Sequence, residues 1–320
     1  MLHMVYNPAS QSGRGRLHAI NLYKRIKKEH IPVRTHATKF RNHAAELIKV
    51  LNLTENDILL VLGGDGSLNE LLQGIPMPIK PAVILHPVGS GNDFVRGIEQ
   101  DSSVDKLIEN IKAFKDKAKE LKHLDIGTST VTKSNGKVKN HHFIVSSGMG
   151  YDANVCHAIE LTKWKKTFNK FKIGSIVYTF IGLLEVGKYD LHDGVRTANM
   201  IKMVLDDGDE YEFDDVVFFS AHNTPYEGGG YKFAPDASPT DGFLDICVVT
   251  AKNKAKAVTT LLSAMGGAKH VNKENVHMLR CKKASITPNV PMTMHTDGEV
   301  ITDVAHVALS ISEYKLPYIL

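Results

Sequence analysis

A short glycine-rich segment that contains one acid, Gly63–Ser67, carries the clearest chemical signal in the sequence. It follows the apolar run Asp57–Leu62 and precedes a helical pattern, so it lies between a predicted strand and a predicted helix. Glycines let the backbone approach a ligand closely, and the unpaired N–H groups at the start of a helix favour phosphate. The segment therefore predicts a phosphate-binding loop, with Ser67 as the helix N-cap.

An acidic residue, Asp65, is unexpected in a loop that binds phosphate. A carboxylate repels phosphate unless a cation lies between them, and Mg²⁺ bridges carboxylate to phosphate. Alternatively, the carboxylate faces an acceptor hydroxyl and takes its proton. Both roles belong to phosphoryl transfer. A tight turn in which Asp65 only hydrogen-bonds the backbone is the structural alternative, and Gly63–Ser67 alone does not decide between these roles.

Two further loops have the same character. Gly89–Asn92 ends the predicted strand Pro81–Val88, and Asn7–Gly13 ends the first predicted strand. Ligands of open α/β sheets collect at the carboxyl ends of the strands. Three small, polar, glycine-rich loops in such places predict a cleft for the phosphates of a nucleotide. Asn92 and Asp93 either orient ligand hydroxyls or cap the next helix, and capping is the favoured interpretation of these two residues alone.

Other catalytic signatures do not occur in the 320 residues. The sequence has no Gly-x-Gly-x-x-Gly and no His-Glu-x-x-His, and Gly182–Tyr189 only approaches a Gly-x4-Gly-Lys-Ser/Thr loop because it ends in tyrosine. The pair His141–His142 is more typical of a strand or a surface than of a metal site. Phosphoryl transfer is therefore the chemistry that the motifs favour.

The elements that would position these loops alternate along the first third of the chain. Short apolar runs predict parallel strands, and stretches with helical spacing predict the helices between them. The predicted strands are His3–Pro8, Ile31–Thr38, Asp57–Leu62 and Pro81–Val88, and the predicted helices are Arg16–His30, His43–Leu53, Leu68–Ile75 and Asp105–Lys119. The pattern indicates an α/β domain with an open, mostly parallel sheet that has helices on both faces.

After about Leu124 the pattern changes to short alternating runs separated by Gly, Asp-Gly and Pro turns. Such runs predict a mainly antiparallel β domain, interrupted by helices near Ala153–Val186 and Lys252–Met265. We therefore expect a first domain over residues 1–125 and a β-sandwich-like second domain over residues 126–303.

The composition sets broad limits. Lys and Arg number 39 against 35 Asp and Glu, and this net charge of +4 suits phosphates or an anionic surface as well as an ordinary soluble enzyme. No dense basic block occurs, so we expect no nucleic-acid partner. Three widely separated cysteines, no secretion signal and no run of about 18 apolar residues favour a cytoplasmic protein without a membrane span.

At this point the motifs resemble a known family. Asn7–Gly13, Gly63–Glu70 and Pro87–Phe94, in this order, resemble the diacylglycerol kinase catalytic fold, and most closely the bacterial soluble lipid kinases that are related to sphingosine kinases. Four later segments also resemble motifs of this family: Leu124–Ser129, Ser146–Val155, Tyr226–Val249 and His295–Val300. The resemblance covers nearly the whole chain.

The resemblance implies ATP and Mg²⁺ as cofactors, with ATP in the cleft between the two domains. It also implies that a C-terminal segment, residues 304–320, returns to the first domain. The residues that it assigns to nucleotide binding are Asn7, Ser10, Gly13, Thr38, Gly63, Gly64, Asp65, Gly66, Ser67, Asn69, Ser90 and Asn92.

The resemblance further assigns three catalytic carboxylates, Asp65, Asp125 and Glu299. Asp65 and Asp125 would organise the metal ion and its waters, and Glu299 would take the proton of the acceptor. Asp241, with the carbonyl groups of Ser238 and Phe243, resembles a structural Mg²⁺ site. Without the resemblance, the segments around Asp241 and Glu299 are plain turns.

The expected function is transfer of the γ-phosphoryl group of ATP to a lipid hydroxyl, most simply that of diacylglycerol. Phosphatidylglycerol, a sphingoid base or a polyprenol are alternative acceptors. An NAD kinase, which shares the glycine–aspartate loop, and a binding protein without activity are alternative functions. The basic amphipathic segment Leu161–Phe180 would contact an anionic membrane at the inner face, unless it is an ordinary helix with a solvated lysine face. The sequence leaves open whether the chain forms a homodimer.

Overall fold

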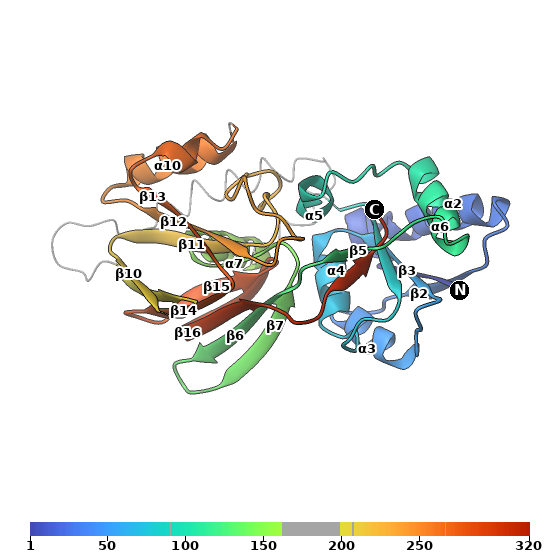
Figure 1. Cartoon of the computed structure of the whole chain (residues 1–320), viewed down its shortest axis with the longest axis horizontal. Helices are drawn as coiled ribbons and strands as arrows, with labels where there is room; N and C mark the ends of the chain where they lie inside the picture. The colour runs from blue at the N-terminus through green and yellow to red at the C-terminus, as the bar shows by residue number, and fades with distance from the viewer. Residues whose placement is uncertain (90, 162–198, 207, 266) are drawn as a thin grey trace.

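The computed structural model describes residues 1–89, 91–161, 199–206, 208–265 and 267–320. The α/β half and the strand-rich half of the molecule lie side by side along its longest axis (Figure 1). Two predictions lie outside the described residues. They are the nucleotide contact of Ser90 and the basic amphipathic helix, of which only Leu161 is described.

The first sheet has the order β2-β1-β3-β4-β17-β5, and its first four strands run parallel. Its six described strands are β1 (Leu2–Tyr6), β2 (Val33–Ala37), β3 (Ile58–Gly63), β4 (Ala82–Pro87), β5 (Lys122–Leu124) and β17 (Leu316–Tyr318). Every residue of β3 is buried, as expected of a central parallel strand whose two faces are both covered.

Helices cover both faces of this sheet. They are α1 (Ser10–Gly13), α2 (Gly15–Lys28), α3 (His43–Val50), α4 (Asp65–Leu72), α5 (Asp93–Gly97) and α6 (Val104–Lys115). Leu59 and Val61 of β3 pack in one core with α3 and α4, whereas Leu60 packs in a second core with α2 and α6. The predicted open α/β sheet with helices on both faces is therefore confirmed.

The second sheet is antiparallel and curls around its own core. Its eleven described strands are β6 (Gly127–Lys133), β7 (Val138–Phe143), β8 (Ser146–Gly150), β9 (Ile201–Leu205), β10 (Asp209–Phe213), β11 (Val216–His222), β12 (Leu244–Thr250), β13 (Val276–Cys281), β14 (Lys283–Pro288), β15 (Met292–Thr296) and β16 (Glu299–Ile311). The described helical elements of this domain are α7 (Tyr151–Leu161), α10 (Lys254–Met265) and a 3-10 turn, η1 (Lys269–Asn272).

The boundary between the second domain and the C-terminal segment lies later in the chain than the predicted boundary at residue 303. β16 continues to Ile311 and pairs with β14, β15 and β6, so residues 304–311 belong to the second sheet. Only the segment after Ser312 crosses to the first domain, where β17 lies between β4 and β5 (Figure 1). The boundary prediction was wrong because β16 continues through Asp303, which has a φ of 64°, although its pairing with β15 and β6 is irregular near this residue.

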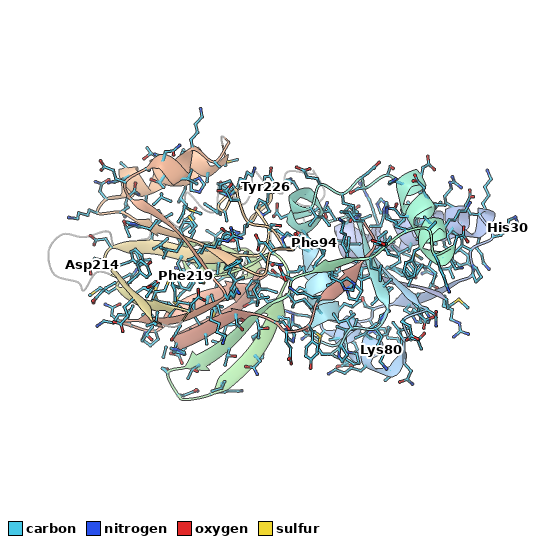
Figure 2. The ribbon with its side chains drawn as sticks, viewed as in Figure 1. His30, Lys80, Phe94, Asp214, Phe219 and Tyr226 are labelled. Atoms are coloured by element: carbon cyan, nitrogen blue, oxygen red, sulfur yellow. The ribbon has the colours of Figure 1, made fainter. Side chains whose placement is uncertain are left out.

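The two domains have separate cores. Phe94 of α5 is fully buried in the first domain, and Phe219 of β11 is fully buried in the second (Figure 2). Within the described part of the chain, no helix is both long and apolar enough to cross a bilayer.

Candidate functional site

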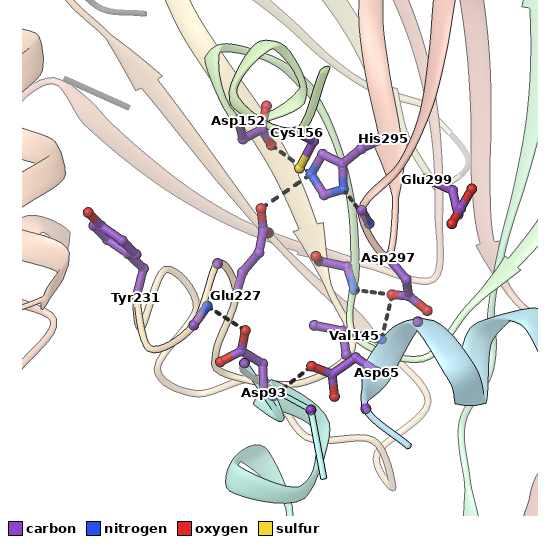
Figure 3. A pocket seen from close by; sticks show the side chains of 18 of the residues that line it. Asp65, Asp93, Val145, Asp152, Cys156, Glu227, Tyr231, His295, Asp297 and Glu299 are labelled. Carbon is purple, nitrogen blue, oxygen red and sulfur yellow. Dashed lines mark hydrogen bonds and ion pairs between the residues drawn. The ribbon is translucent and has the colours of Figure 1, made fainter. Parts of the chain in front are cut away.

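A cavity of about 450 Å³ lies between the two domains (Figure 3). The loops that follow β1, β3 and β4 line it from the first domain. From the second domain, the start of α7, the loop Glu227–Tyr231, α10 and the β15–β16 turn line it. The predicted position of the site, at the carboxyl ends of the parallel strands, agrees with this cavity.

Two of the glycine loops touch each other. A Cβ atom added to Gly89 would lie 2.8 Å from the Cα atom of Gly64, so only glycine allows this approach. Gly64 is also the N-cap of α4, which begins at Asp65. The prediction of Ser67 as N-cap was wrong, because the helix starts three residues earlier than predicted. Ser67 lies in its first turn, and its N–H donates to Gly64 O at 2.9 Å.

Asp65 joins the two loops. Its carboxylate accepts the backbone N–H groups of Asp93 at 2.9 Å and of Phe94 at 3.1 Å, and so caps α5. Burial raises the pKa of Asp65, although these two N–H groups oppose the shift. The Asp65 side chain thus lines the cavity and also makes hydrogen bonds that stabilise the fold. Asp65 therefore hydrogen-bonds the backbone, as the structural alternative predicted. The N–H groups that it accepts belong to the neighbouring loop after β4 and not to its own turn.

Asp93, considered with Asn92 for ligand contact or helix capping, lies beside Asp65. Its carboxylate pairs with Arg96 and accepts the N–H of Gly229, from the second domain, at 2.7 Å. Burial, and then the nearby charge of Asp65, raise the pKa of Asp93 to about 7. Two adjacent buried carboxylates with raised pKa values indicate a place that is short of positive charge.

Asn92 precedes α5 in a left-handed conformation with φ of 56°. Its Nδ2 donates to Gly89 O at 3.0 Å, whereas its Oδ1 is buried without a hydrogen-bond partner. A buried amide oxygen is expected to have a donor, so a ligand with a hydroxyl or amino group would satisfy it. Asn92 lines the cavity, as a ligand contact requires.

The other predicted nucleotide residues separate into two groups. Asn7, Gly64, Asp65, Gly66, Ser67 and Asn92 line the cavity, and Ser10, Gly13, Thr38, Gly63 and Asn69 do not. The Ser10 hydroxyl donates to Asn7 O at 2.9 Å, and the Thr38 N–H donates to Tyr6 O at 2.9 Å. Ser10 and Thr38 therefore shape the loops beside the cavity.

Asn69 connects the two domains. Its Nδ2 donates to Asp297 Oδ2 at 2.8 Å and to His142 O at 3.0 Å. Asp297 also accepts three backbone N–H groups from Ile144–Ser146, at 2.8 to 3.0 Å. Burial raises the pKa of Asp297 to about 6 even though these donors lower it. This buried junction holds the β15–β16 turn against α4, and so places Glu299.

Glu299, the predicted base, is the first residue of β16 and lines the cavity. Its side chain is 46% exposed and pairs with Arg41, which follows β2 in the first domain. An accessible carboxylate at the edge of a cavity can reach an acceptor hydroxyl. Asp65 and Glu299 therefore share one crevice.

The third predicted catalytic residue, Asp125, does not line the cavity. Its side chain is fully buried, pairs with Lys315 and accepts the N–H of Gly242 at 2.8 Å. Its backbone carbonyl accepts Asn223 Nδ2 at 3.0 Å. The structure places Asp125 outside the cavity, because the segment before β17 supplies Lys315, which pairs with its carboxylate. Its catalytic role stays a prediction. Asp125 ties the domain boundary to the chain end.

The predicted structural Mg²⁺ site is not evident in the geometry. Asp241 Oδ2 pairs with Arg280 at 2.6 Å, and Oδ1 accepts the N–H of Phe243 at 3.0 Å. The guanidinium of Arg280 and the ammonium of Lys282 both lie over the Phe243 ring. A divalent cation beside Asp241 would have to compete with the Arg280 guanidinium group that already pairs with this carboxylate. The Ser238 hydroxyl bonds Thr240.

A buried group of two carboxylates and one imidazole was not predicted. Nε2 of His295 lies 3.1 Å from Asp152 Oδ2 and 3.2 Å from Glu227 Oε1 (Figure 3). Burial lowers the pKa of His295, but Glu227 and Asp152 raise it by more, to well above its ordinary value. All three residues lie within sequence motifs quoted above, and their position in those motifs was the available signal.

The cavity continues beyond this group into an apolar end. Side chains from α7, α10 and the loop after β11 line it: Tyr151, Val155, Tyr231, Phe233 and Leu261. The end near the glycine loops is polar instead. One cavity thus has glycine loops and apolar side chains in its lining, together with the carboxylates and His295.

The ionisable side chains that line the cavity are mostly acidic. Seven lining residues carry a carboxylate: Asp65, Glu70, Asp93, Asp152, Glu227, Asp297 and Glu299. Among the described residues that line the cavity, His295 is the one side chain that can carry a positive charge. A polyphosphate would therefore enter only together with cations.

Sequence models of two families match the chain. Residues 1–126 match the diacylglycerol kinase catalytic domain, and residues 144–314 match the YegS C-terminal NAD kinase beta sandwich-like domain. The chain belongs to the diacylglycerol kinase-like lipid kinases. The predicted family is thereby confirmed, and the protein is an enzyme of the lipid kinase type.

Relatives of this lipid kinase are diverged but match along most of their length. It is 24% identical over 308 residues to the diacylglycerol kinase of Bacillus subtilis, covering 92% of this chain and 88% of that protein. It is 24% identical over 297 residues to the diacylglycerol kinase of Staphylococcus carnosus, with 92% and 87% covered.

Solved structures share the fold of this lipid kinase. A diacylglycerol kinase from Bacillus anthracis superposes with a TM-score of 0.66 at 20% identity, covering 99% of this chain and 95% of that one. Yeast NADH kinase complexed with NADH superposes with a TM-score of 0.58 at 9% identity, covering 100% and 83%. At such identities the likeness shows the fold alone.

Proposed function

We propose that this lipid kinase transfers the γ-phosphoryl group of ATP to a lipid hydroxyl, with diacylglycerol as the first acceptor. The supporting observation is the continuity of the cavity between its two ends. Glycine loops and the first turn of α4 line one end, where unpaired N–H groups favour phosphate. Apolar side chains line the other end, so a phosphorylated donor and a long-chain acceptor can meet in one cavity.

Mg²⁺ fits the residues present at the phosphate end. Asp65 and Asp93 lie side by side with raised pKa values although Arg96 pairs with Asp93, so two carboxylates share one guanidinium group. These two carboxylates would hold the ion, because hard divalent cations prefer oxygen ligands. When bound, Mg²⁺ neutralises the charge that develops on the phosphate oxygens.

In the proposed mechanism, Glu299 is the general base. The acceptor hydroxyl gives its proton to the Glu299 carboxylate while its oxygen forms a bond to the γ-phosphorus. The bond between that phosphorus and the β,γ-bridging oxygen breaks, and ADP leaves. Arg41 pairs with Glu299 at the edge of the cavity. Because the acceptor is a lipid, we place this reaction at the inner membrane surface.

The acceptor is tested directly with the purified full chain. ATP, Mg²⁺ and mixed micelles that carry diacylglycerol, phosphatidylglycerol, a sphingoid base or a polyprenol are incubated with the enzyme, and NAD is a further arm. Mass spectrometry of the products is expected to show phosphatidic acid from the diacylglycerol arm. Phosphorylation of NAD alone, or release of ADP without any lipid product, would rule out the proposed function.

Glu299→Gln tests the assignment of the base. Turnover is expected to fall by at least about 100-fold, because the amide cannot take a proton. The free energy of unfolding is expected to change by less than about 1 kcal/mol, since an exposed ion pair contributes little. Glu109→Gln, which removes an exposed α6 carboxylate paired with Lys106, is the matched control and is expected to leave turnover unchanged. Near-normal turnover of Glu299→Gln would reject the assignment.

A further inference from the structure

Helix α10 buries one face and exposes two large apolar side chains on the rest of its surface. Ala257, Leu261 and Ala264 pack in a core with β11 and β12. Outside this face, Leu262 is 48% exposed and Met265 is 46% exposed, and their spacing of three residues makes them neighbours on the helix. Exposed apolar side chains are common singly, so the charges around this pair decide what it can contact.

The chain around α10 is basic. Residues 246–273 contain five lysines and neither aspartate nor glutamate. These lysines are Lys252, Lys254, Lys256, Lys269 and Lys273. The first four are exposed, and the ammonium group of Lys273 donates to Thr259 O of α10 at 3.1 Å. Positive charge therefore precedes and follows Leu262 and Met265 along the chain, and no acid of this segment compensates it.

The basic surface continues from α10 toward the first domain. The N–H of Lys232 donates to Ala264 O at 3.3 Å, so Lys232 lies beside the end of α10. Its ammonium group lies 5.6 Å from the centre of the Tyr226 ring, and the guanidinium group of Arg96, in α5, lies 5.5 Å from the same ring (Figure 2). Basic residues therefore extend from α10 across the domain boundary to α5.

The cavity and this basic surface share α10. Leu261 lines the cavity, whereas the next residue, Leu262, is exposed, and α10 lies at the outer edge of the second domain (Figure 1). A helix that exposes apolar side chains among lysines suits the interface of an anionic bilayer. The apolar side chains enter the acyl boundary, and the lysines meet the lipid phosphates. An acidic protein would also attract the lysines, but the neighbouring cavity favours a lipid surface.

We propose that the exposed part of α10 and the lysines around it dock the enzyme on an anionic lipid bilayer. This α10 surface consists of Leu262, Met265, Lys252, Lys256 and Lys269. The inference rests on the proposed function, because a kinase with a lipid acceptor has to meet a bilayer. Docking through α10 would hold the helix that lines the cavity against the source of the acceptor.

Vesicle binding tests the α10 surface. The full chain, without ATP or acceptor, is mixed with vesicles of phosphatidylcholine alone or with about 30% phosphatidylserine, which is not among the proposed acceptors. Binding to the anionic vesicles is expected to be at least about tenfold tighter, and to weaken at least about tenfold from about 0.1 M to about 0.5 M NaCl, because salt screens the lysines. Equal binding to both kinds of vesicle would overturn the proposal.

Lys256→Glu with Lys269→Glu reverses two charges of the α10 surface. The Kd for anionic vesicles is expected to rise at least about tenfold. Lys49→Glu with Lys80→Glu is the matched control, because both lysines are exposed in the first domain and Lys80 lies far from α10 (Figure 2). Its Kd is expected to stay within about threefold of that of the unmodified protein. Equal losses in both variants would show a general effect of charge and overturn the proposal.

Leu262→Gln tests the apolar part of the surface. Binding to anionic vesicles is expected to weaken at least about fivefold, because the amide does not enter the acyl boundary. Val50→Gln is the matched control, since Val50 is 73% exposed on α3. The melting temperature of each variant is measured first, and little change is expected because the replaced side chains are exposed. Unchanged vesicle binding by Leu262→Gln would reject the α10 surface.

Two further measurements separate the α10 surface from its alternatives. Lys165→Glu with Lys166→Glu alters the basic segment Leu161–Phe180, and a loss of vesicle binding confined to this variant would overturn the proposal. Light scattering without lipid shows whether Leu262→Gln separates a dimer and still binds vesicles, in which case α10 joins two copies instead. Since neither ATP nor acceptor is present, docking through α10 is supported even where no lipid is phosphorylated, and its absence leaves the kinase reaction untouched.

Discussion

At the scale of the residue, two carboxylates of one cavity have opposite surroundings. Asp65 is held by two backbone N–H groups of α5, whereas Glu299 is 46% exposed and pairs only with a surface arginine, Arg41, among the contacts described. The Asp65 carboxylate therefore caps α5, whereas the Glu299 carboxylate makes an exposed ion pair, and we propose a catalytic role for both. Substitution should separate these roles.

Asp65→Asn is expected to lower stability as well as turnover. The amide replaces one acceptor oxygen with a donor that faces the N–H groups of Asp93 and Phe94, so we expect a loss of about 1–3 kcal/mol in the free energy of unfolding. Turnover is expected to fall at least about 100-fold, as for Glu299→Gln. Denaturant unfolding and steady-state kinetics measure the two effects. An unfolding midpoint equal to that of the unmodified protein would contradict the capping role.

At the scale of the element, the site depends on the contact between the loops after β3 and β4. Each loop has glycine where they touch, and each leads into a helix that begins with an acid, Asp65 for α4 and Asp93 for α5. The parallel pairing of β3 with β4 puts both loop starts at the same edge of the sheet. The backbone itself, more than any side chain, therefore builds the phosphate end of the cavity.

Two glycine substitutions test whether the backbones of these loops build the phosphate end of the cavity. In Gly89→Ala the new methyl group would lie 2.7 Å from Asn92 Oδ1 and 2.8 Å from Gly64 Cα, so we expect a loss of about 1–3 kcal/mol of stability and weaker ATP binding. In Gly66→Ala the methyl group meets nothing within 4 Å, and a helical alanine is expected to stabilise the free protein by up to about 1 kcal/mol. Thermal unfolding and nucleotide titration check both. Equal stabilities would show that the loops do not touch.

At the scale of the whole molecule, the cavity needs both domains in place. Asp93 accepts Gly229 N–H, Asn69 donates to Asp297, and Arg41 pairs with Glu299. Each bridge joins a residue of the first domain to one of the second at the rim or floor of the cavity. Catalytic geometry should therefore respond to changes that touch no substrate.

Asn69→Ala removes the side-chain donor that joins α4 to Asp297 and His142. We expect stability to fall by about 1–3 kcal/mol and kcat to fall beyond what the folded fraction explains, because Glu299 follows the turn that Asp297 holds. Asn110→Ala is the matched control, since it removes a buried asparagine from α6 within the first domain. A similar loss of stability with unchanged kcat is expected there. If both variants lose only stability, the bridge does not position the base.

The sequence alone determined the alternation of strands and helices, the three loops at strand ends and the change to an antiparallel domain. These features follow from local rules, since hydrophobic periodicity and glycine placement act over a few neighbouring residues. The acid in Gly63–Ser67 likewise indicated phosphoryl transfer before any contact was known. Its partners, the N–H groups of Asp93 and Phe94, lie 28 and 29 positions away and could not be read from the loop itself.

Only the tertiary structure decided which carboxylates face the cavity. Asp125 lies in a motif that resembles the family, yet Lys315, 190 positions later, occupies it in the interior. Asp152 and His295 are 143 positions apart and meet at the boundary between the polar and apolar ends. Such encounters depend on long-range chain crossing, which spacing along the sequence does not encode. The continuation of β16 past Asp303 likewise depended on its pairing with β6 and β14.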